Sequence, residues 1–288
     1  MANANLDTWL THMRRGDFAA AWEISDRSLR EFGDTPDWHL SRHEQHVWRG
    51  APLAGKRVLV RCYRGLGDTI QFARYLPMLH AIARHVTVWL QPALIPLFRT
   101  ADGYDELLPL HDGTPDVDYD ADVEIMELAH VFRTTLDTIP NRVPYFHVDP
   151  AALPAADVRR VGVVWKSGDW DPQRCIPFAL IERLGEIPGI TLLPLQQDAA
   201  QHPLAKEPLG TARLMRALDL VITVDSMPAH LAGALGVPVW TLLRKDADWR
   251  WMEARTDSPW YPTMRLFRQE RLGEWEPVIT RVKRALSP

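Results

Sequence analysis

The chain has 288 residues, of which 46% are hydrophobic and 24% charged, as is typical of a soluble globular protein. The formal net charge of −4 gives no basic bias toward nucleic acid. Two cysteines are too few for a disulfide framework and suit a reducing compartment. The first residues lack the apolar core of a signal peptide, and no run approaches the roughly 18 apolar residues of a membrane span. We therefore expect a soluble, cytosolic protein.

The first 37 residues predict a helical hairpin, because apolar residues recur at helical spacing on both sides of Gly16. Residues 16–36 resemble the second half of a tetratricopeptide unit. One such unit cannot bury its own apolar face. We interpret it as a remnant or a docking cap rather than as a peptide-binding array.

From Lys56 onward, β-rich runs alternate with helical patterns, which predicts βαβ units with parallel sheets. Residues 139–160 carry four prolines and no strong apolar period, so they read as a linker between two series. Two Rossmann-like halves facing each other are the expected architecture. The expected strands are 57–63, 86–90, 106–108, 123–126, 161–165, 190–195, 220–224, 237–243 and 264–267, and a closing helix runs from about 275 to 286.

The segment 224–236 follows an apolar strand and opens a helix. Asp225 and Ser226 suit an N-cap, and Pro228 suits the first helical turn. The N–H groups of such a helix end form an anion site, at the edge of the sheet where α/β proteins bind nucleotides. The alternative is a well-capped helix with His230 satisfied in the core.

A second cluster follows the first strand of the second series. Lys166 supplies a point charge and Arg174 a two-pronged guanidinium, and both suit a diphosphate. Both would lie on the same sheet edge as Asp225. The alternative is two solvated cations in a surface loop.

The third cluster is the Gly65-Leu66-Gly67-Asp68-Thr69 turn. It is neither a Walker A loop nor a complete dinucleotide fingerprint, because Ile70 occupies the third glycine position. Asp68 is either a helix cap or a carboxylate that acts as a general base.

Together these clusters resemble glycosyltransferase family 9, which includes the heptosyltransferases, and in particular its bacterial branch associated with tetratricopeptide repeats. The resemblance covers about residues 56–286. It rests on 65–75, on the loop that ends at Arg174-Cys175-Ile176-Pro177, on 218–235, and on 248–251 with 257–269.

The resemblance implies a GT-B fold, with the acceptor on the first Rossmann-like domain and a nucleotide-sugar donor on the second. It implies that Asp68 is the general base of an inverting displacement and that no metal or other cofactor is required. The implied donor-binding residues are Lys166, Ser167, Arg174, Asp225, Ser226, Met227 and His230. The implied phosphate or acceptor loop contains Gly65, Gly67, Thr69 and Gln71.

Two other patterns favour structural explanations. Asp116, Asp118, Asp120, Asp122 and Glu127 approach the spacing of a calcium loop, but Ala121 stands where that loop needs glycine. A solvated acidic connector is the preferred interpretation. The aromatic residues Trp249, Trp251, Trp260 and Tyr261 could stack on a sugar or a base, but interdomain packing is the more frequent role.

We therefore expect a helical hairpin at 1–50, an acceptor domain at 51–150 and a donor domain at 151–288. The expected function is transfer of a sugar, with an ADP-heptose-like donor as one option, to a glycan, lipid-linked glycan or protein. The alternatives are a nucleotide-sugar epimerase and a non-catalytic protein that binds a nucleotide sugar, or a partner through residues 1–50. Nucleic acid is not an expected partner, and the expected location is the cytoplasm, with the inner membrane surface as a further option.

Overall fold

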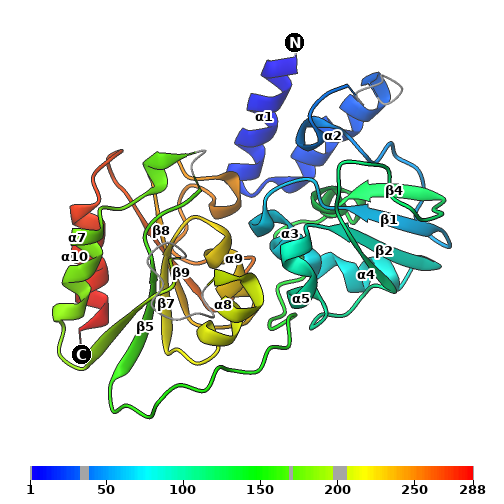
Figure 1. Cartoon of the computed structure of the whole chain (residues 1–288). Coiled ribbons are helices and arrows are strands. Elements are labelled where there is room, and N and C mark those ends of the chain that lie inside the picture. The colour runs from blue at the N-terminus through cyan, green and yellow to red at the C-terminus, as the bar shows by residue number, and fades with distance from the viewer. Residues whose placement is uncertain (1, 33–38, 169–170, 197–205, 288) are drawn as a thin grey trace. The chain divides into compact units, whose positions relative to one another are not determined.

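The computed structural model describes residues 2–32, 39–168, 171–196 and 206–287 (Figure 1). The chain divides into two compact units, residues 1–140 and 141–288, and each contains one parallel sheet.

The first unit contains a sheet with the strand order β3-β2-β1-β4. The middle of β1 is buried, as expected for a parallel strand covered on both faces. After β3 the chain returns to the other side of β1, so the order reverses between β1 and β4. The strands are β1 (Arg57–Arg61), β2 (His85–Leu90), β3 (Glu106–Pro109) and β4 (Ala121–Glu124). The short helices are α3 (Leu66–Phe72), α4 (Leu76–His80), α5 (Ile95–Phe98) and α6 (Leu128–Val131), with 3₁₀ turns η1 (Arg42–Glu44), η2 (Ala73–Tyr75), η3 (Pro92–Leu94) and η4 (Ile125–Glu127).

The N-terminal hairpin consists of α1 (Ala2–Arg15) and α2 (Phe18–Phe32), and α2 is fixed to the end of the first unit. The indole nitrogen of Trp22 donates to the carbonyl of Thr134 at 2.7 Å. Asp26 accepts hydrogen bonds from both terminal nitrogens of Arg133 at 2.8 Å and lies 2.8 Å from Nε2 of His130. The hairpin is therefore part of this unit and not an appendage.

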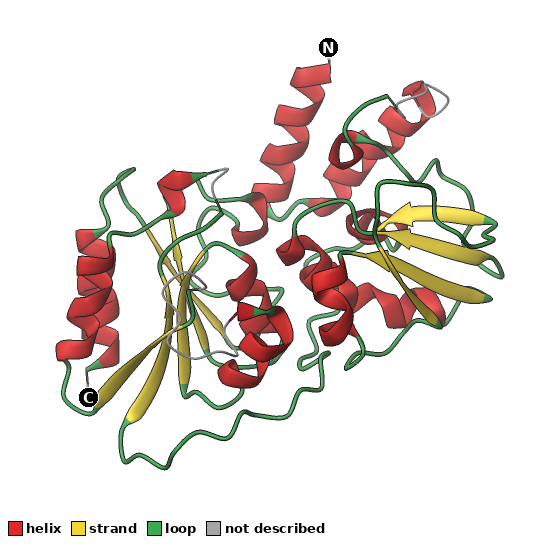
Figure 2. Ribbon diagram, in the orientation of Figure 1, coloured by secondary structure: helices red, strands yellow, loops and turns green. Residues whose placement is uncertain are grey.

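The second unit contains a sheet with the order β6-β5-β7-β8-β9, all parallel. Figures 1 and 2 show α7 and α10 on one face of this sheet and α8 and α9 on the other. The strands are β5 (Arg159–Val164), β6 (Ile190–Pro194), β7 (Leu220–Val224), β8 (Val239–Leu243) and β9 (Met264–Arg268). The helices are α7 (Phe178–Glu182), α8 (Pro208–Met215), α9 (Met227–Ala234) and α10 (Glu276–Leu286), with 3₁₀ turns η5 (Pro172–Arg174), η6 (Arg183–Glu186) and η8 (Trp249–Trp251).

The predicted order of strands and helices is confirmed, with local differences. Residues 69–84 do not form one continuous helix, because η2 separates α3 from α4 and Pro77, which has no N–H to donate, lies in the first turn of α4. β4 ends at Glu124, where the chain turns into η4. Residues 141–158 form no helix or strand, whereas Arg159 and Arg160, which were expected to end the linker, begin β5.

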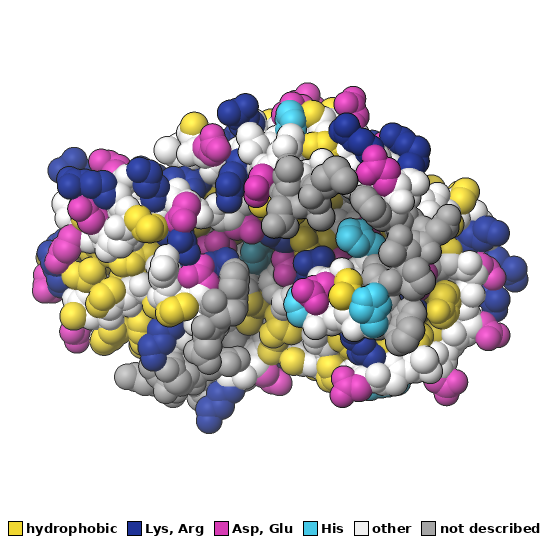
Figure 3. Space-filling model, turned by 90° about the horizontal axis from the view of Figure 1, so that it is seen from above, with side chains coloured by type: hydrophobic (Ala, Val, Ile, Leu, Met, Phe, Trp, Pro, Cys, Tyr) yellow, Lys and Arg dark blue, Asp and Glu magenta, His cyan; other side chains and the backbone are white. Residues whose placement is uncertain are grey.

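No helix among the described residues is long and apolar enough to cross a membrane. On the face in Figure 3, basic and acidic side chains are interspersed among the described residues. Cross-element ion pairs such as Arg183–Glu276 and Lys283–Glu186, both at 2.8 Å, illustrate this mixing.

Gly233 is the position where α9 packs most closely on a ring. A Cβ atom there would lie 2.5 Å from Cγ and Cδ1 of Tyr261, which is fully buried. We predict that Gly233→Ala lowers the free energy of unfolding by about 1–3 kcal/mol through overpacking. Urea denaturation measures this change.

Gly185→Ala is the matched control, because its Cβ would meet only the flexible end of Leu192, at 3.3 Å. It should change the free energy of unfolding by no more than about 1 kcal/mol in either direction. Equal effects of the two substitutions would contradict the close contact between Gly233 and Tyr261.

Candidate functional site

The strand order reverses between β5 and β7 in the second unit, and ligands of open α/β sheets bind outside the carboxyl ends of strands at such a point. Lys166 and Arg174 belong to the loop after β5, and Asp225 directly follows β7. The structure therefore brings the first and second sequence clusters to one edge of one sheet.

Asp225 and Arg174 are in direct contact at this edge. Nη1 of Arg174 donates to the backbone carbonyl of Asp225 at 3.1 Å and lies 3.6 Å from its Oδ2. Burial raises the pKa of Asp225 to about 6, although the charge of Arg174 opposes this shift. The prediction that Arg174 and Asp225 lie on the same sheet edge is confirmed. Arg174 is a paired cation with little exposed surface.

The N-terminus of α9 begins beside Asp225. Ser226 occupies the N-cap position with extended backbone, but its hydroxyl donates to the carbonyl of Val224 at 3.3 Å and does not cap the helix. Met227 and Pro228 form the start of the first turn and are partly exposed. The positive end of the α9 dipole therefore points toward the same sheet edge as Arg174.

His230 is buried on α9 and held by two rings. Its Nδ1 lies 3.0 Å from the hydroxyl of Tyr261, and its ring stacks on Trp251 with centroids 5.2 Å apart. Trp249 and Trp260 also contact each other edge to face. These ring contacts lie within the second unit, so the aromatic cluster fixes the orientation of His230.

The loop after β5 is tied to itself. The hydroxyl of Ser167 donates to the carbonyl of Asp171 at 3.0 Å, so it braces the loop. Lys166 is exposed, and its backbone N–H donates to Oε1 of Gln196 at 3.0 Å. Asp169 and Trp170 of this loop lie outside the described residues.

The sequence reading missed several charged residues at this edge. Asp171, in the same loop, contacts Arg174 and also Arg244, the first residue after β8. Asp248 pairs with Arg250 at 2.8 Å, and despite burial the pKa of Asp248 is lowered by Arg250. Arg244 could have been identified from the sequence, because it directly follows an apolar strand.

The first unit has its own reversal of strand order, between β1 and β4, and Asp68 follows β1 there. Asp68 is the third residue of α3, and its Oδ2 accepts a hydrogen bond from the N–H of Gly65 at 3.1 Å. The carboxylate is partly exposed. The geometry thus provides a cap and leaves the carboxylate accessible, so both sequence interpretations are compatible with it.

The residues predicted to form the phosphate or acceptor loop differ in how exposed they are. Gly65 is exposed and Gly67 is partly exposed, whereas the side chains of Thr69 and Gln71 are fully buried. The hydroxyl of Thr69 donates to Oε1 of Gln91 at 3.1 Å. Thr69 and Gln71 therefore anchor α3 in the interior.

Two glutamates near Asp68 with raised pKa values were not expected. Glu124 ends β4, and burial raises its pKa to about 8, with Glu127 and Asp68 acting in the same direction. Burial also raises the pKa of Glu127 to about 7, although this carboxylate accepts hydrogen bonds from the N–H groups of Val47, Trp48 and Glu124. Asp68 thus lies near acidic groups that favour their protonated forms.

The remaining acidic residues form the predicted connector. Asp120 pairs with Arg57 at 3.0 Å and Asp122 with Arg61 at 2.8 Å, while Asp118 is exposed near Arg57. Within the described part of the chain, no group of three or more His, Cys, Asp or Glu side chains could hold a metal ion. Glu127 is the exception to the solvated interpretation, because backbone N–H groups of the protein bind its carboxylate.

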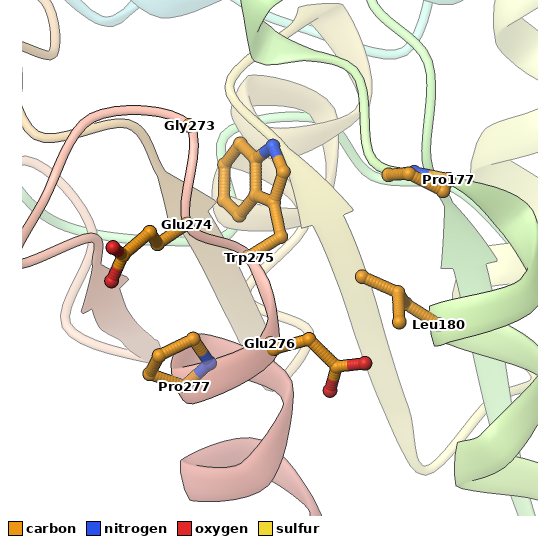
Figure 4. A pocket seen from close by; sticks show the side chains of 7 residues that line it. All are labelled: Pro177, Leu180, Gly273, Glu274, Trp275, Glu276 and Pro277. Atoms are coloured by element: carbon orange, nitrogen blue, oxygen red, sulfur yellow. The ribbon is translucent and has the colours of Figure 1, made fainter.

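A hollow of about 400 Å³ lies between α7 and the start of α10 (Figure 4). Pro177, Leu180 and Trp275 form its apolar lining, and Glu274 and Glu276 add carboxylates. None of the predicted site residues lines it, and its acidic groups do not suit a phosphate.

Comparison with known proteins bears directly on the second unit. Residues 209–272 match the model of glycosyltransferase family 9 (heptosyltransferase). The expected resemblance to family 9 is confirmed. The matched segment contains Asp225, Ser226, Met227 and His230, together with the aromatic cluster.

Solved structures of family 9 proteins share the fold. A family 9 glycosyltransferase of Veillonella parvula superposes with a TM-score of 0.52 at 15% identity, covering 76% of this chain and 87% of that one. ADP-heptose LPS heptosyltransferase II of Escherichia coli gives a TM-score of 0.53 at 13% identity, covering 80% and 97%. The iron-containing glycosyltransferase TibC of enterotoxigenic Escherichia coli gives 0.53 at 14%, covering 79% and 67%. These likenesses confirm the α/β fold of the GT-B type.

A curated relative, protein FlbA of Caulobacter vibrioides, is 28% identical over 83% of this chain. The alignment spans 48% of that protein, so this chain corresponds to about half the length of the relative.

We predict that Glu124→Gln becomes more stable relative to the wild type as pH rises. The pKa of Glu124 in the folded protein, about 8, exceeds the ordinary value of 4.5. The contribution of the protonated carboxyl group to the free energy of unfolding is therefore fully present below pH 4.5 and is lost as the pH rises to 8. Glutamine mimics the protonated form at every pH. The difference in unfolding free energy should grow by up to about 1.4 kcal/mol per pH unit between pH 5 and 8.

Chemical denaturation at pH 5, 6, 7 and 8 measures this difference. Glu44→Gln, at an exposed position of the same unit, is the control and should give a difference that does not vary with pH. A pH-independent difference for Glu124→Gln would show that Glu124 is ionised in the folded protein.

Proposed function

We propose that this protein is an inverting glycosyltransferase, which moves a sugar from a nucleotide-diphosphate donor to a hydroxyl of a glycan, a lipid-linked glycan or a protein. The observation that carries the proposal is the buried Asp225. It lies at the strand-order reversal of the second unit, beside Arg174, inside the segment that matches family 9.

The proposed reaction is a single displacement. Asp68 accepts the proton of the acceptor hydroxyl, whose oxygen attacks the anomeric carbon of the donor sugar. The bond between that carbon and the diphosphate oxygen breaks with its electron pair, and the nucleoside diphosphate leaves. Attack opposite the leaving group inverts the anomeric centre.

The second unit supplies the groups that stabilise the leaving diphosphate. Lys166 and Arg174 carry positive charge, and the N-terminus of α9 adds the positive end of a helix dipole. Tyr261 and Trp251 hold His230 in place, and we assign it to the lining of the donor site. We assign the donor to this unit and the acceptor to the first unit.

The proposed donor is an ADP-heptose-like nucleotide sugar, because the description of one structural neighbour names ADP-heptose. The proposed reaction uses no metal ion or further cofactor, as the family resemblance implies. The structural neighbour TibC, in contrast, is iron-containing. A protein partner at residues 1–50 also belongs to the proposal, because the side chain of Leu6 on α1 is largely exposed.

We predict that one nucleoside diphosphate stabilises the protein against heat. The test compares ADP, GDP, UDP, CDP and dTDP, each with magnesium and with excess EDTA. A ligand at about 100 times its Kd adds about 2.7 kcal/mol, which raises Tm by several degrees. A shift that EDTA abolishes would contradict metal independence, and no shift with any nucleotide would favour the non-catalytic protein that binds a partner through residues 1–50.

Asp68→Asn should abolish transfer while preserving nucleotide binding. Loss of a general base lowers kcat by about a hundredfold to ten-thousandfold. The measurement is sugar transfer from the nucleotide sugar that thermal unfolding identifies. Asp137→Asn, at an exposed aspartate of the same unit, should retain full activity.

Unchanged transfer by Asp68→Asn would reduce Asp68 to a helix cap. Epimerised donor without any acceptor product would instead indicate the nucleotide-sugar epimerase.

A further inference from the structure

Asp171 lies between two guanidinium groups at the donor edge of the second sheet. Its Oδ2 accepts from Nε of Arg174 at 3.0 Å and from Nη1 of Arg244 at 2.9 Å. Its Oδ1 is 3.1 Å from the same nitrogen of Arg244. One carboxylate therefore binds two arginines that belong to different loops.

Each arginine is also held by a second aspartate. Arg174 donates to the backbone of Asp225 at 3.1 Å. Arg244 makes a two-pronged contact with Asp246, with Nε–Oδ1 at 2.6 Å and Nη2–Oδ2 at 2.7 Å. These contacts would keep both guanidiniums in place if Asp171 moved away.

The sheet topology explains why the two arginines meet. Strands β5, β7 and β8 are neighbours, and the residues in question follow them in the same order (Figure 1). Arg174 lies in the loop after β5, Asp225 follows β7, and Arg244 follows β8. The two arginines therefore follow the strands on either side of β7, at the carboxyl edge of the sheet and next to the strand-order reversal.

A carboxylate between two guanidiniums occupies the kind of site that a phosphate takes. Arginine binds carboxylate and phosphate in the same fork geometry, and a diphosphate offers more negative charge and more acceptor oxygens than one aspartate. The side chains of Asp171, Arg174 and Arg244 each retain between 13% and 16% exposure, so the cluster is accessible to an incoming anion.

We propose that Arg174 and Arg244 form a clamp for the diphosphate of the donor, and that Asp171 occupies this clamp as an internal counter-ion until the diphosphate displaces it. This inference rests on the proposed function, and it adds Arg244 and Asp171 to the donor site. The clamp recognises the diphosphate and not the base, so inorganic pyrophosphate competes with the nucleotide.

Calorimetric titration with ADP and with inorganic pyrophosphate tests the clamp in the wild type, Asp171→Asn, Arg244→Gln and the double variant. Asp171→Asn should bind both ligands about tenfold more tightly, since it removes the competing charge and preserves the shape of the side chain. Arg244→Gln should bind both at least about tenfold more weakly, because it loses hydrogen bonds from a charged group. In the Arg244→Gln background, Asp171→Asn should increase the affinity by less than it does in the wild type.

Asp257→Asn is the matched control. It removes the same charge and breaks another arginine–aspartate pair of this unit, Arg255–Asp257 at 2.6 Å. It should leave both affinities unchanged, so an equal gain would reduce the effect of Asp171→Asn to net charge. Thermal unfolding of each variant confirms that it is folded.

The outcomes separate the clamp from the proposed function. Wild-type binding of ADP that neither Asp171→Asn nor Arg244→Gln alters would overturn the clamp and leave the glycosyltransferase proposal intact. Pyrophosphate binding with the predicted changes, but without sugar transfer, would support the clamp and contradict the transfer reaction. Weaker ADP binding by Asp171→Asn with unchanged pyrophosphate binding would place Asp171 on the nucleoside and overturn its counter-ion role.

Discussion

The reversal of strand order in each parallel sheet is the constraint on which the rest of the structure depends. At such a reversal, the connections that follow two neighbouring strands leave in opposite directions, so a crevice opens at the carboxyl ends of these strands. In the first unit, β1 and β4 bring Asp68 near Glu124. In the second, β5 and β7 bring Arg174 against Asp225. Each unit thus concentrates its unusual charges at one edge of its sheet, while apolar residues fill the remainder of the sheet interior.

The carboxyl edges of the two sheets differ in which interactions compensate for the burial of charged groups. At the first edge, burial raises the pKa of both Glu124 and Glu127, and backbone N–H groups supply most of the compensation. At the second edge, arginines and aspartates alternate, and Asp225 lies within this ionic network. A region of alternating charge can exchange one anion for another at moderate cost, whereas a carboxyl pair is suited to holding protons. This contrast agrees with a donor in the second unit and an acceptor hydroxyl in the first.

The sequence predicted the strands well because parallel strands such as 220–224 are continuous apolar runs between turn residues. Asp68, Arg174 and Asp225 were also identifiable, because each follows such a run. The pairing of Asp171 with Arg244 joins residues 73 positions apart and requires that β8 lie beside β7. The carboxylate of Glu127 is bound by backbone N–H groups 79 and 80 positions away. The acidic run in which Glu127 stands therefore gave no indication of these contacts.

The attachment of α2 to the end of the first unit has a consequence for folding order. Trp22 and Thr134 are 112 positions apart, and Asp26 and Arg133 are 107 apart. The two hairpin helices can form from local contacts, but docking of α2 must await the segment that follows β4. During synthesis, the apolar face of α2 therefore stays uncovered until nearly the whole first unit has left the ribosome. Docking of α2 thus joins the two ends of this unit.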